Sequence, residues 1–287
     1  MVDRSSDRRS SPAILRRELA DRLRELRVRS GLTIDEVASR LGAQPSKVSR
    51  LETGRRPGTI EDVRELAELY RVGPDELAEL LELSLNSRTI SRWRQYGALV
   101  SDHAELEENA SRISHYETSI VPGLLQAEDY ARAVTAGFIP DLGPGDREKL
   151  VQGRLARQAL LLGRDEPRLD YVLDESALLR QVGGPSVMRQ QLRTLLDRSR
   201  LPGISIRVLP MTAGAHPGMD TAFEILAIPR ISDVVVYLEG YAGTFFLRKP
   251  AEVARYGAAF QRVRDLALDR DASRTLIEQR AAELSDR

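Results

Sequence analysis

A tight turn between two short helical segments constrains this chain most. The first segment starts at Thr33, where the order Thr-Ile-Asp-Glu has the form of a capping box, and it ends at Gly42. The second starts at Pro45, a residue suited to the first position of a helix, and it stops at Gly54. Only residues 42–44 separate the two segments. Two short helices with so short a connection are typical of a helix-turn-helix unit, whose second helix enters the major groove of DNA.

Apolar residues at helical spacing extend this unit to five helices. Leucines recur every three or four residues between Leu15 and Leu26, after a Ser11-Pro12 pair that suits a helix start. Residues 59–70 and 74–81 show the same period. We therefore expect an all-α helix-turn-helix domain over residues 12–82, after a disordered tail at 1–11. The Ser/Thr/Asn-rich stretch 83–92 is the expected linker to a second domain at 93–287.

Charge is distributed unevenly along this first part of the chain. The whole sequence balances 43 Lys and Arg against 43 Asp and Glu, so total charge favours no particular partner. Residues 1–58, however, hold 14 basic and 8 acidic residues, whereas residues 59–82 hold 2 basic and 8 acidic residues. Such a layout favours a cationic face that binds a polyanion, with an anionic side opposite.

Six short stretches within residues 12–80 carry a family resemblance: Gly31-Leu32-Thr33, Val37-Ala38, Leu41-Gly42, Ser46-Lys47-Val48-Ser49-Arg50, Leu51-Glu52-Thr53-Gly54 and Arg55-Arg56-Pro57. On these residues the domain resembles the phage-repressor-like, or xenobiotic-response-element, helix-turn-helix family. The resemblance implies that the second short helix faces the groove and that Thr33 and Arg55 approach phosphates. Pro45 stands where some family members place a glutamine. Unlike glutamine, proline has no side-chain hydrogen-bond donor, so this position departs from the family pattern.

The residues themselves point to the same surface. Val48 and Leu51 must face the core, which leaves the other side of the segment for DNA, and Arg50 is the best candidate for a bidentate contact to guanine. The arginines in the following Gly/Pro-containing loop suit backbone phosphates. The candidate DNA-binding residues are Thr33, Gln44, Pro45, Ser46, Lys47, Ser49, Arg50, Arg55 and Arg56. The alternative is a helical interaction domain that does not contact DNA.

The remaining two hundred residues predict an α+β domain. Helical patterns cover residues 96–120, 127–136 and 146–162. Strand patterns at 168–173, 204–209, 222–228 and 234–238 then alternate with helical ones at 175–180, 185–200 and 251–268. Because residues 229–233 are few enough for a hairpin, part of the sheet should be antiparallel. We expect helices followed by a mixed or antiparallel sheet with covering helices.

Several stretches of this part carry a second resemblance: Tyr116-Glu117, Val121-Pro122-Gly123-Leu124-Leu125-Gln126, Tyr130-Ala131, Arg154, Arg157-Gln158, Leu173-Asp174-Glu175-Ser176-Ala177-Leu178, Val182-Gly183-Gly184, Gln191-Leu192, Val208-Leu209-Pro210 and Gly214-Ala215-His216. They resemble the antitoxin-like C-terminal domain of unknown function in a large family of actinobacterial regulators. The resemblance implies a regulator, often encoded near a small partner protein, and it identifies no ligand.

The sequence offers little that suggests catalysis. It has no cysteine, and its histidines, His103, His115 and His216, lack the spacing of a metal site. No G-x-S-x-G elbow or phosphate-binding glycine loop is present, and Asp174 before a helical segment suits a cap. We expect no metal, no cofactor and no enzymatic activity. Apolar stretches such as residues 234–238 are too short for a membrane helix, which favours a cytoplasmic, nucleoid-associated protein.

These features favour a sequence-specific transcription regulator that binds double-stranded DNA, with a second domain that folds alone and binds a small-molecule effector or a partner protein. We expect a homodimer, because one recognition helix contacts only a few base pairs. The expected effector site lies between residues 121–130 and 216–223, with Tyr130, His216 and Phe223 as candidate contacts. The alternatives are an antitoxin-like module that neutralises a small partner and regulates its own gene, and a DNA-targeted enzyme.

Overall fold

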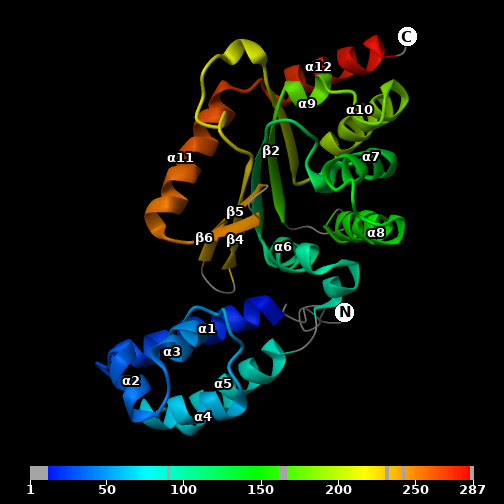
Figure 1. Ribbon diagram of the computed structural model, residues 1–287. Coiled ribbons are helices and arrows are strands. Elements are labelled where there is room, and N and C mark those ends of the chain that lie inside the picture. The colour runs from blue at the N-terminus through cyan, green and yellow to red at the C-terminus, as the bar shows by residue number, and fades with distance from the viewer. Residues whose placement is uncertain (1–11, 89–90, 162–166, 230–232, 241–242, 285–287) are drawn as a thin grey trace, which may run out of the picture. The chain divides into compact units, whose positions relative to one another are not determined.

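The computed structural model describes residues 12–88, 91–161, 167–229, 233–240 and 243–284. It divides into two compact units, of which the first ends at Arg94 and the second begins at Gln95 (Figure 1). The tail at residues 1–11 lies outside the described residues. No helix in the described ranges has an apolar stretch long enough to cross a membrane.

The N-terminal unit contains the five predicted helices. They are α1 (Pro12–Arg29), α2 (Ile34–Arg40), α3 (Pro45–Glu52), α4 (Ile60–Leu69) and α5 (Pro74–Ser87). Helix α5 continues past the end that we expected, so much of the predicted linker is helical up to Ser87. A short 3₁₀ helix, η1 (Arg92–Tyr96), follows.

Capping residues and glycines set the ends of these helices. Thr33 and Thr59 each form a capping box at the starts of α2 and α4, as the hydroxyl accepts a backbone N–H three residues on. Gly42, between α2 and α3, has a φ of +60°, a left-handed conformation that glycine adopts without steric cost. The turn between α2 and α3 can therefore be short, which keeps the two helices close together.

The C-terminal unit surrounds one mixed sheet with the strand order β3-β2-β1-β4-β5-β6. The strands are β1 (Arg112–Glu117), β2 (Arg168–Asp174), β3 (Ile204–Leu209), β4 (Phe223–Ile228), β5 (Asp233–Gly240) and β6 (Gly243–Leu247). Strands β1, β2 and β3 run parallel, whereas β1–β4, β4–β5 and β5–β6 are antiparallel pairs. The predicted mixed sheet is confirmed, and so is the antiparallel pairing of the strands on either side of residues 229–233.

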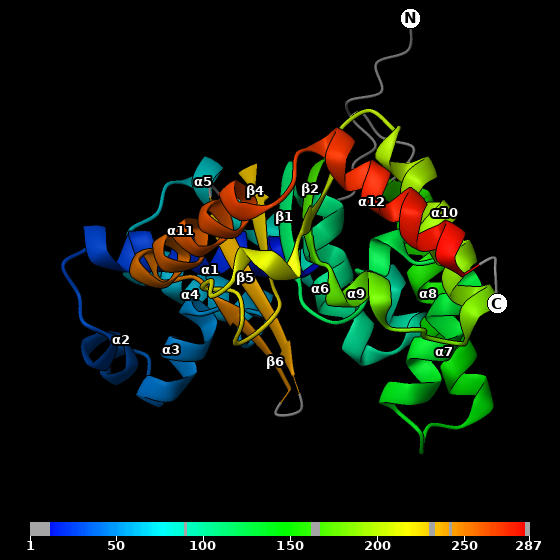
Figure 2. The same ribbon diagram turned by 90° about the horizontal axis from the view of Figure 1, so that it is seen from above.

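Helices cover both faces of this sheet. The elements are α6 (Ala98–Asn109), η2 (Gly123–Leu125), α7 (Glu128–Phe138), α8 (Pro144–Leu161), α9 (Ser176–Leu179), α10 (Pro185–Ser199), η3 (Met211–Ala213), α11 (Pro250–Leu266) and α12 (Arg270–Glu283). Helix α11 packs on one face, and α6, α7, α8 and α10 lie on the other (Figures 1 and 2). Helix α12 contacts α10 and β3.

The helix predicted over residues 96–120 is wrong in its second half. Residues 96–120 were expected to form a single helix, but α6 ends at Asn109 and β1 follows as a central strand. Ile113, Tyr116 and Ile120 recur at three- and four-residue spacing, which imitates a helical period. Pairing with β2 on one side and β4 on the other decides the strand instead. Strand β6 and helix α12 were not predicted either.

Candidate nucleic-acid interface

Helix α3 buries one side and exposes the other. Val48 and Leu51 are buried in the core of the N-terminal unit. Arg50 is exposed, and its Nε donates a hydrogen bond to the carbonyl of Ser46 at 3.1 Å, so the side chain follows the helix surface. Ser49 is half-buried. The exposed residues before and in the first turn of α3 are Gln44, Pro45 and Ser46. This side of the unit thus presents an arginine and short polar groups, and their contact with DNA stays a prediction.

Lys47 and Arg56 share one carboxylate of α4. The Nζ atom of Lys47 lies 2.6 Å from Oδ1 of Asp62, and a guanidinium nitrogen of Arg56 lies 3.7 Å from Oδ2. Burial raises the pKa of Asp62, but hydrogen bonds from Lys47 and Thr59 outweigh burial and hold this pKa below its ordinary value. Lys47 therefore joins α3 to α4, and it is less available to DNA than the sequence suggested.

Thr33 and Arg55, the two predicted phosphate contacts, have different surroundings. Both residues are exposed. The Thr33 hydroxyl accepts a hydrogen bond from the Glu36 amide at 3.2 Å and donates one to the Glu36 carboxylate at 2.9 Å. The Thr33 amide also donates to that carboxylate and lowers the pKa of Glu36. A carboxylate so close to Thr33 disfavours a phosphate there, whereas Arg55 is the better candidate for a backbone contact.

A buried ion pair that the sequence did not indicate fixes the end of α3. Glu52 is 5% exposed and accepts two hydrogen bonds from Nε of Arg27, at 2.8 and 3.1 Å. Another nitrogen of Arg27 donates to the carbonyl of Leu32 at 2.8 Å. The hydrogen bond to Glu52 raises the pKa of Arg27. Arg27 thereby ties α1 both to the end of α3 and to the loop that enters α2.

Two of the three candidate effector residues, Tyr130 and Phe223, are buried in the C-terminal unit, and His216 is half-buried. Tyr130 is fully buried, and its hydroxyl accepts a hydrogen bond from the Val121 amide at 3.1 Å. Phe223 and His216 both pack against Tyr116, each with its ring centroid 5.8 Å from the Tyr116 ring. The structure therefore brings His216 and Phe223 together, while Tyr130 has a separate partner. Their role in effector binding stays a prediction.

Gly218 lets its loop approach the Tyr116 ring closely. A Cβ atom on Gly218 would lie 2.3 Å from Cε1 of Tyr116, so any side chain there would collide with the ring. The Gly218 amide also donates to Nδ1 of His216 at 3.2 Å. At the end of β2, Asp174 accepts a hydrogen bond from the amide of Ser176, the first residue of α9, at 2.9 Å, but the N-cap position of α9 is Glu175.

Three segments of the second resemblance, which contain Arg154, Gln158 and Gln191, contact residues 121–127. Gln191 accepts a hydrogen bond from the Ala127 amide at 2.6 Å and donates to the Leu125 carbonyl at 2.8 Å. Gln158 donates to the carbonyls of Gly123 and Gln126, at 2.7 and 2.9 Å. Arg154 donates to the side chain of Gln126, and burial lowers the pKa of Arg154 to about 10. Gln158 and Gln191 therefore satisfy backbone groups of η2 and the residues that follow it, and Arg154 holds the Gln126 side chain.

A buried polar cluster lies between the sheet and α6. The nitrogen Nε2 of His103 pairs with Glu224 of β4, and Tyr237 stacks on the His103 ring with 3.9 Å between centroids. Glu107 lies beside them and accepts two hydrogen bonds from Arg157, at 2.6 and 2.8 Å. His103, Glu107 and Glu224 hold potential ligand atoms within 4.8 Å of one another. Arg157 donates to both oxygens of Glu107, so ion pairs link the members of this cluster.

Two family models match the sequence. Residues 100–279 match the model described as a domain of unknown function (DUF5753), and this match covers more than half of the chain. Residues 18–80 match a model described as a helix-turn-helix domain, which includes α2, α3 and the turn between them. No curated protein and no solved structure matches the chain.

Proposed function

Because the chain belongs to the DUF5753 family and carries a helix-turn-helix domain before that domain, we propose that it is a sequence-specific, DNA-binding regulator of transcription. The observation that carries the proposal is the match over α2, its turn and α3, where Arg50 is exposed and Val48 and Leu51 are buried. The major groove is wide enough to admit an α-helix, so the exposed polar side of α3 can reach base edges while its apolar side stays in the core.

The proposal gives each unit a task. The N-terminal unit, of the phage-repressor-like type, reads the operator, and the C-terminal unit receives a small effector or a partner protein. The chain has a binding role and no catalytic one, and it acts on DNA of the nucleoid in the cytoplasm. The uneven charge supports this division, because basic residues dominate up to residue 58 and acidic ones dominate from 59 to 82.

Replacing Arg50 by alanine tests base reading. A preferred duplex is first selected from a random pool, and binding is then measured by fluorescence anisotropy at several salt concentrations. Arg50→Ala should weaken binding to the preferred duplex by about 1–3 kcal/mol and relax the preference at one base pair. Arg55→Ala should instead weaken binding to all duplexes and reduce the steepness of the salt dependence.

The control is Arg64→Ala, which removes an exposed arginine from the acidic part of the unit on α4 and should leave DNA affinity unchanged. If Arg50→Ala weakens every duplex equally, Arg50 contacts phosphate and does not read a base. If the unmodified protein binds no selected duplex even at low salt, the proposed function is wrong.

The proposed regulator should bind its operator as a homodimer. Helix α3 has only eight residues, so it reaches a few base pairs, and two copies on half-sites about one helical turn apart supply the missing specificity. Size-exclusion chromatography with light scattering should give twice the chain mass for the free protein. With DNA it should give twice the chain mass plus the mass of one duplex. A monomer under both conditions would exclude this arrangement.

A further inference from the structure

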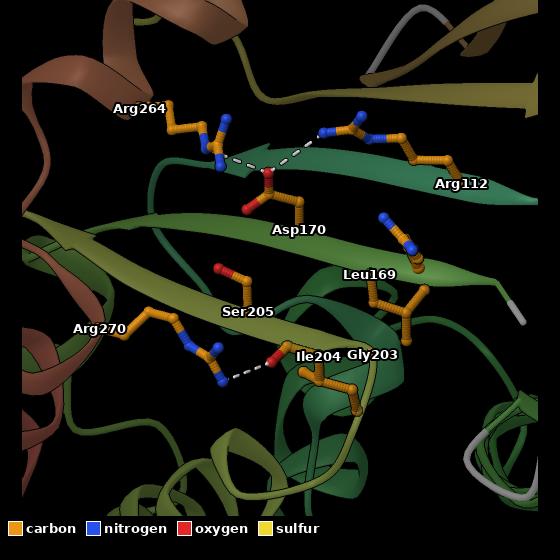
Figure 3. Close-up of a pocket in the computed structure, with 9 residues that line it drawn as sticks. Arg112, Leu169, Asp170, Gly203, Ile204, Ser205, Arg264 and Arg270 are labelled. Carbon is orange, nitrogen blue, oxygen red and sulfur yellow. Dashed lines mark hydrogen bonds and ion pairs between the residues drawn. The ribbon is translucent and has the colours of Figure 1, made fainter. Parts of the chain in front are cut away.

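A groove opens at one edge of the sheet in the C-terminal unit. Its volume is about 230 Å³, and its lining residues are Arg112, Arg168, Leu169, Asp170, Gly203, Ile204, Ser205, Arg264 and Arg270. Strands β1, β2 and β3 are parallel, so their first residues lie at the same edge. The ends of α11 and α12 that face this edge add one arginine each. We call this site the arginine groove (Figure 3).

Among the residues that the structure describes, the arginine groove is lined by four guanidinium groups and one carboxylate. Asp170 is buried, and its Oδ2 lies 3.2 Å from Nε of Arg264 and 3.7 Å from a terminal nitrogen of Arg112. Arg270 donates to the carbonyl of Ile204 at 3.1 Å, and both Arg270 and Arg168 are exposed. One carboxylate cannot neutralise four cations, so these described lining residues together carry an excess of positive charge.

The acidic residues beside Arg270 in sequence do not remove this excess. Asp269 accepts a hydrogen bond from the Ala272 amide at 2.8 Å and caps α12. Asp271 pairs with Arg274 at 2.8 Å. Neither carboxylate is among the residues that line the groove. Four guanidinium groups therefore line one concave surface, and an anion bound there would stabilise them.

We infer that the arginine groove binds the phosphoryl group of a small molecule. Planar guanidinium groups match the oxygen geometry of phosphate, to which each can donate two hydrogen bonds. Asp170 and the Ile204 carbonyl hold three of the four arginines in place before a ligand arrives, which reduces the entropy lost on binding. The volume is below the usual range of about 300–1,000 Å³ for drug-sized ligands, which favours a small phosphate or phosphate ester over a larger one.

The inference concerns the C-terminal unit alone, and only its regulatory meaning rests on the proposed function. If the chain is a regulator, the phosphorylated molecule is its effector, and it must bind the DNA-competent and DNA-incompetent states with different affinities. Binding itself can be measured without DNA.

The test is calorimetric titration and thermal unfolding of the full chain with three probes: inorganic phosphate, ribose 5-phosphate and ribose. We expect ribose 5-phosphate to bind and to raise the melting temperature, and ribose to do neither. If inorganic phosphate binds as tightly as ribose 5-phosphate, free phosphate is the ligand. If ribose 5-phosphate binds more tightly than inorganic phosphate, the ligand is a phosphate ester. Absence of binding by both phosphates overturns the inference.

Arg168→Gln should weaken phosphate binding about tenfold or more, because it removes a charged hydrogen-bond donor at an exposed position. The matched control is Arg274→Gln, which makes the same change one turn along α12 from Arg270 and outside the groove. Equal phosphate affinity of Arg168→Gln and the unmodified protein would contradict the assignment.

DNA binding of the same proteins separates the two proposals. If the unmodified protein binds ribose 5-phosphate but no duplex, the arginine groove stands and the proposed function fails. If Arg168→Gln weakens duplex binding while neither small phosphate binds, the groove contacts the DNA backbone, so the inference fails and the proposed function stands.

Discussion

Replacing Arg157 by methionine is expected to lower the stability of the C-terminal unit by about 3–5 kcal/mol, because a buried charge would lose its partner. Glu107 is 2% exposed, and Arg157 donates two hydrogen bonds to it. Glu224, which is equally buried, lies in the same cluster and adds a second negative charge. Methionine fills similar space but supplies neither the charge nor the donors.

Hydrogen-exchange mass spectrometry on peptides from β1 and β4 measures this loss separately from the N-terminal unit. The double variant Arg157→Met/Glu107→Leu should recover most of the stability, since replacing a whole buried pair by apolar residues is often neutral. Lys149→Met, on the same helix, removes an exposed cation and should change stability by less than about 1 kcal/mol. A single variant as stable as this control would show that Glu107 does not depend on Arg157.

Arg27→Met should destabilise the N-terminal unit by a similar amount, about 3–5 kcal/mol, and should abolish DNA binding through unfolding. The substitution leaves Glu52 buried without its cation and also removes the hydrogen bond to the Leu32 carbonyl. Both ends of the helix-turn-helix unit then lose their attachment to α1. The effect on DNA binding is indirect, because the Arg27 side chain is 14% exposed and its partners are groups within the unit.

Arg29→Met provides the comparison two residues further along α1. Arg29 is 68% exposed and pairs with Glu76 at 3.3 Å, so its loss should have little effect. Hydrogen exchange of peptides from α2 and α3, with anisotropy on the same samples, tests both variants. If Arg27→Met kept normal exchange protection but failed to bind DNA, Arg27 would be a DNA contact and its structural role would be wrong.

Local signals were sufficient to predict the N-terminal fold. Thr33, Thr59 and Pro45 mark helix starts by chemistry that acts within one turn, and Gly42 and Gly54 mark the following ends. In the C-terminal unit the mixed sheet was predicted from short β-branched segments. Strand β1 was missed because its spacing also suits a helix, and only distant pairing partners decide between the two structures.

The candidate sites were less predictable, because their contacts join distant parts of the chain. The outward side of α3 followed from Val48 and Leu51, but the pairing of Lys47 with Asp62 depends on how α4 packs. The arginine groove had no signal, since 40 arginines are spread over the sequence and none of them stands out. The cluster around Glu224 combines residues from two helices and two strands, each ordinary in its own segment.

The position of β1 in the sheet has a consequence for synthesis on the ribosome. The partner of Tyr116 in β4 is Phe223, so more than one hundred residues must be translated between the two strands. At about 5–20 residues per second this takes roughly 5–20 s. The N-terminal unit, whose last α-helix ends at Ser87, has time to fold first. During this interval one edge of β1 has no partner from its own chain, and an unpaired strand edge is where a nascent chain associates with others.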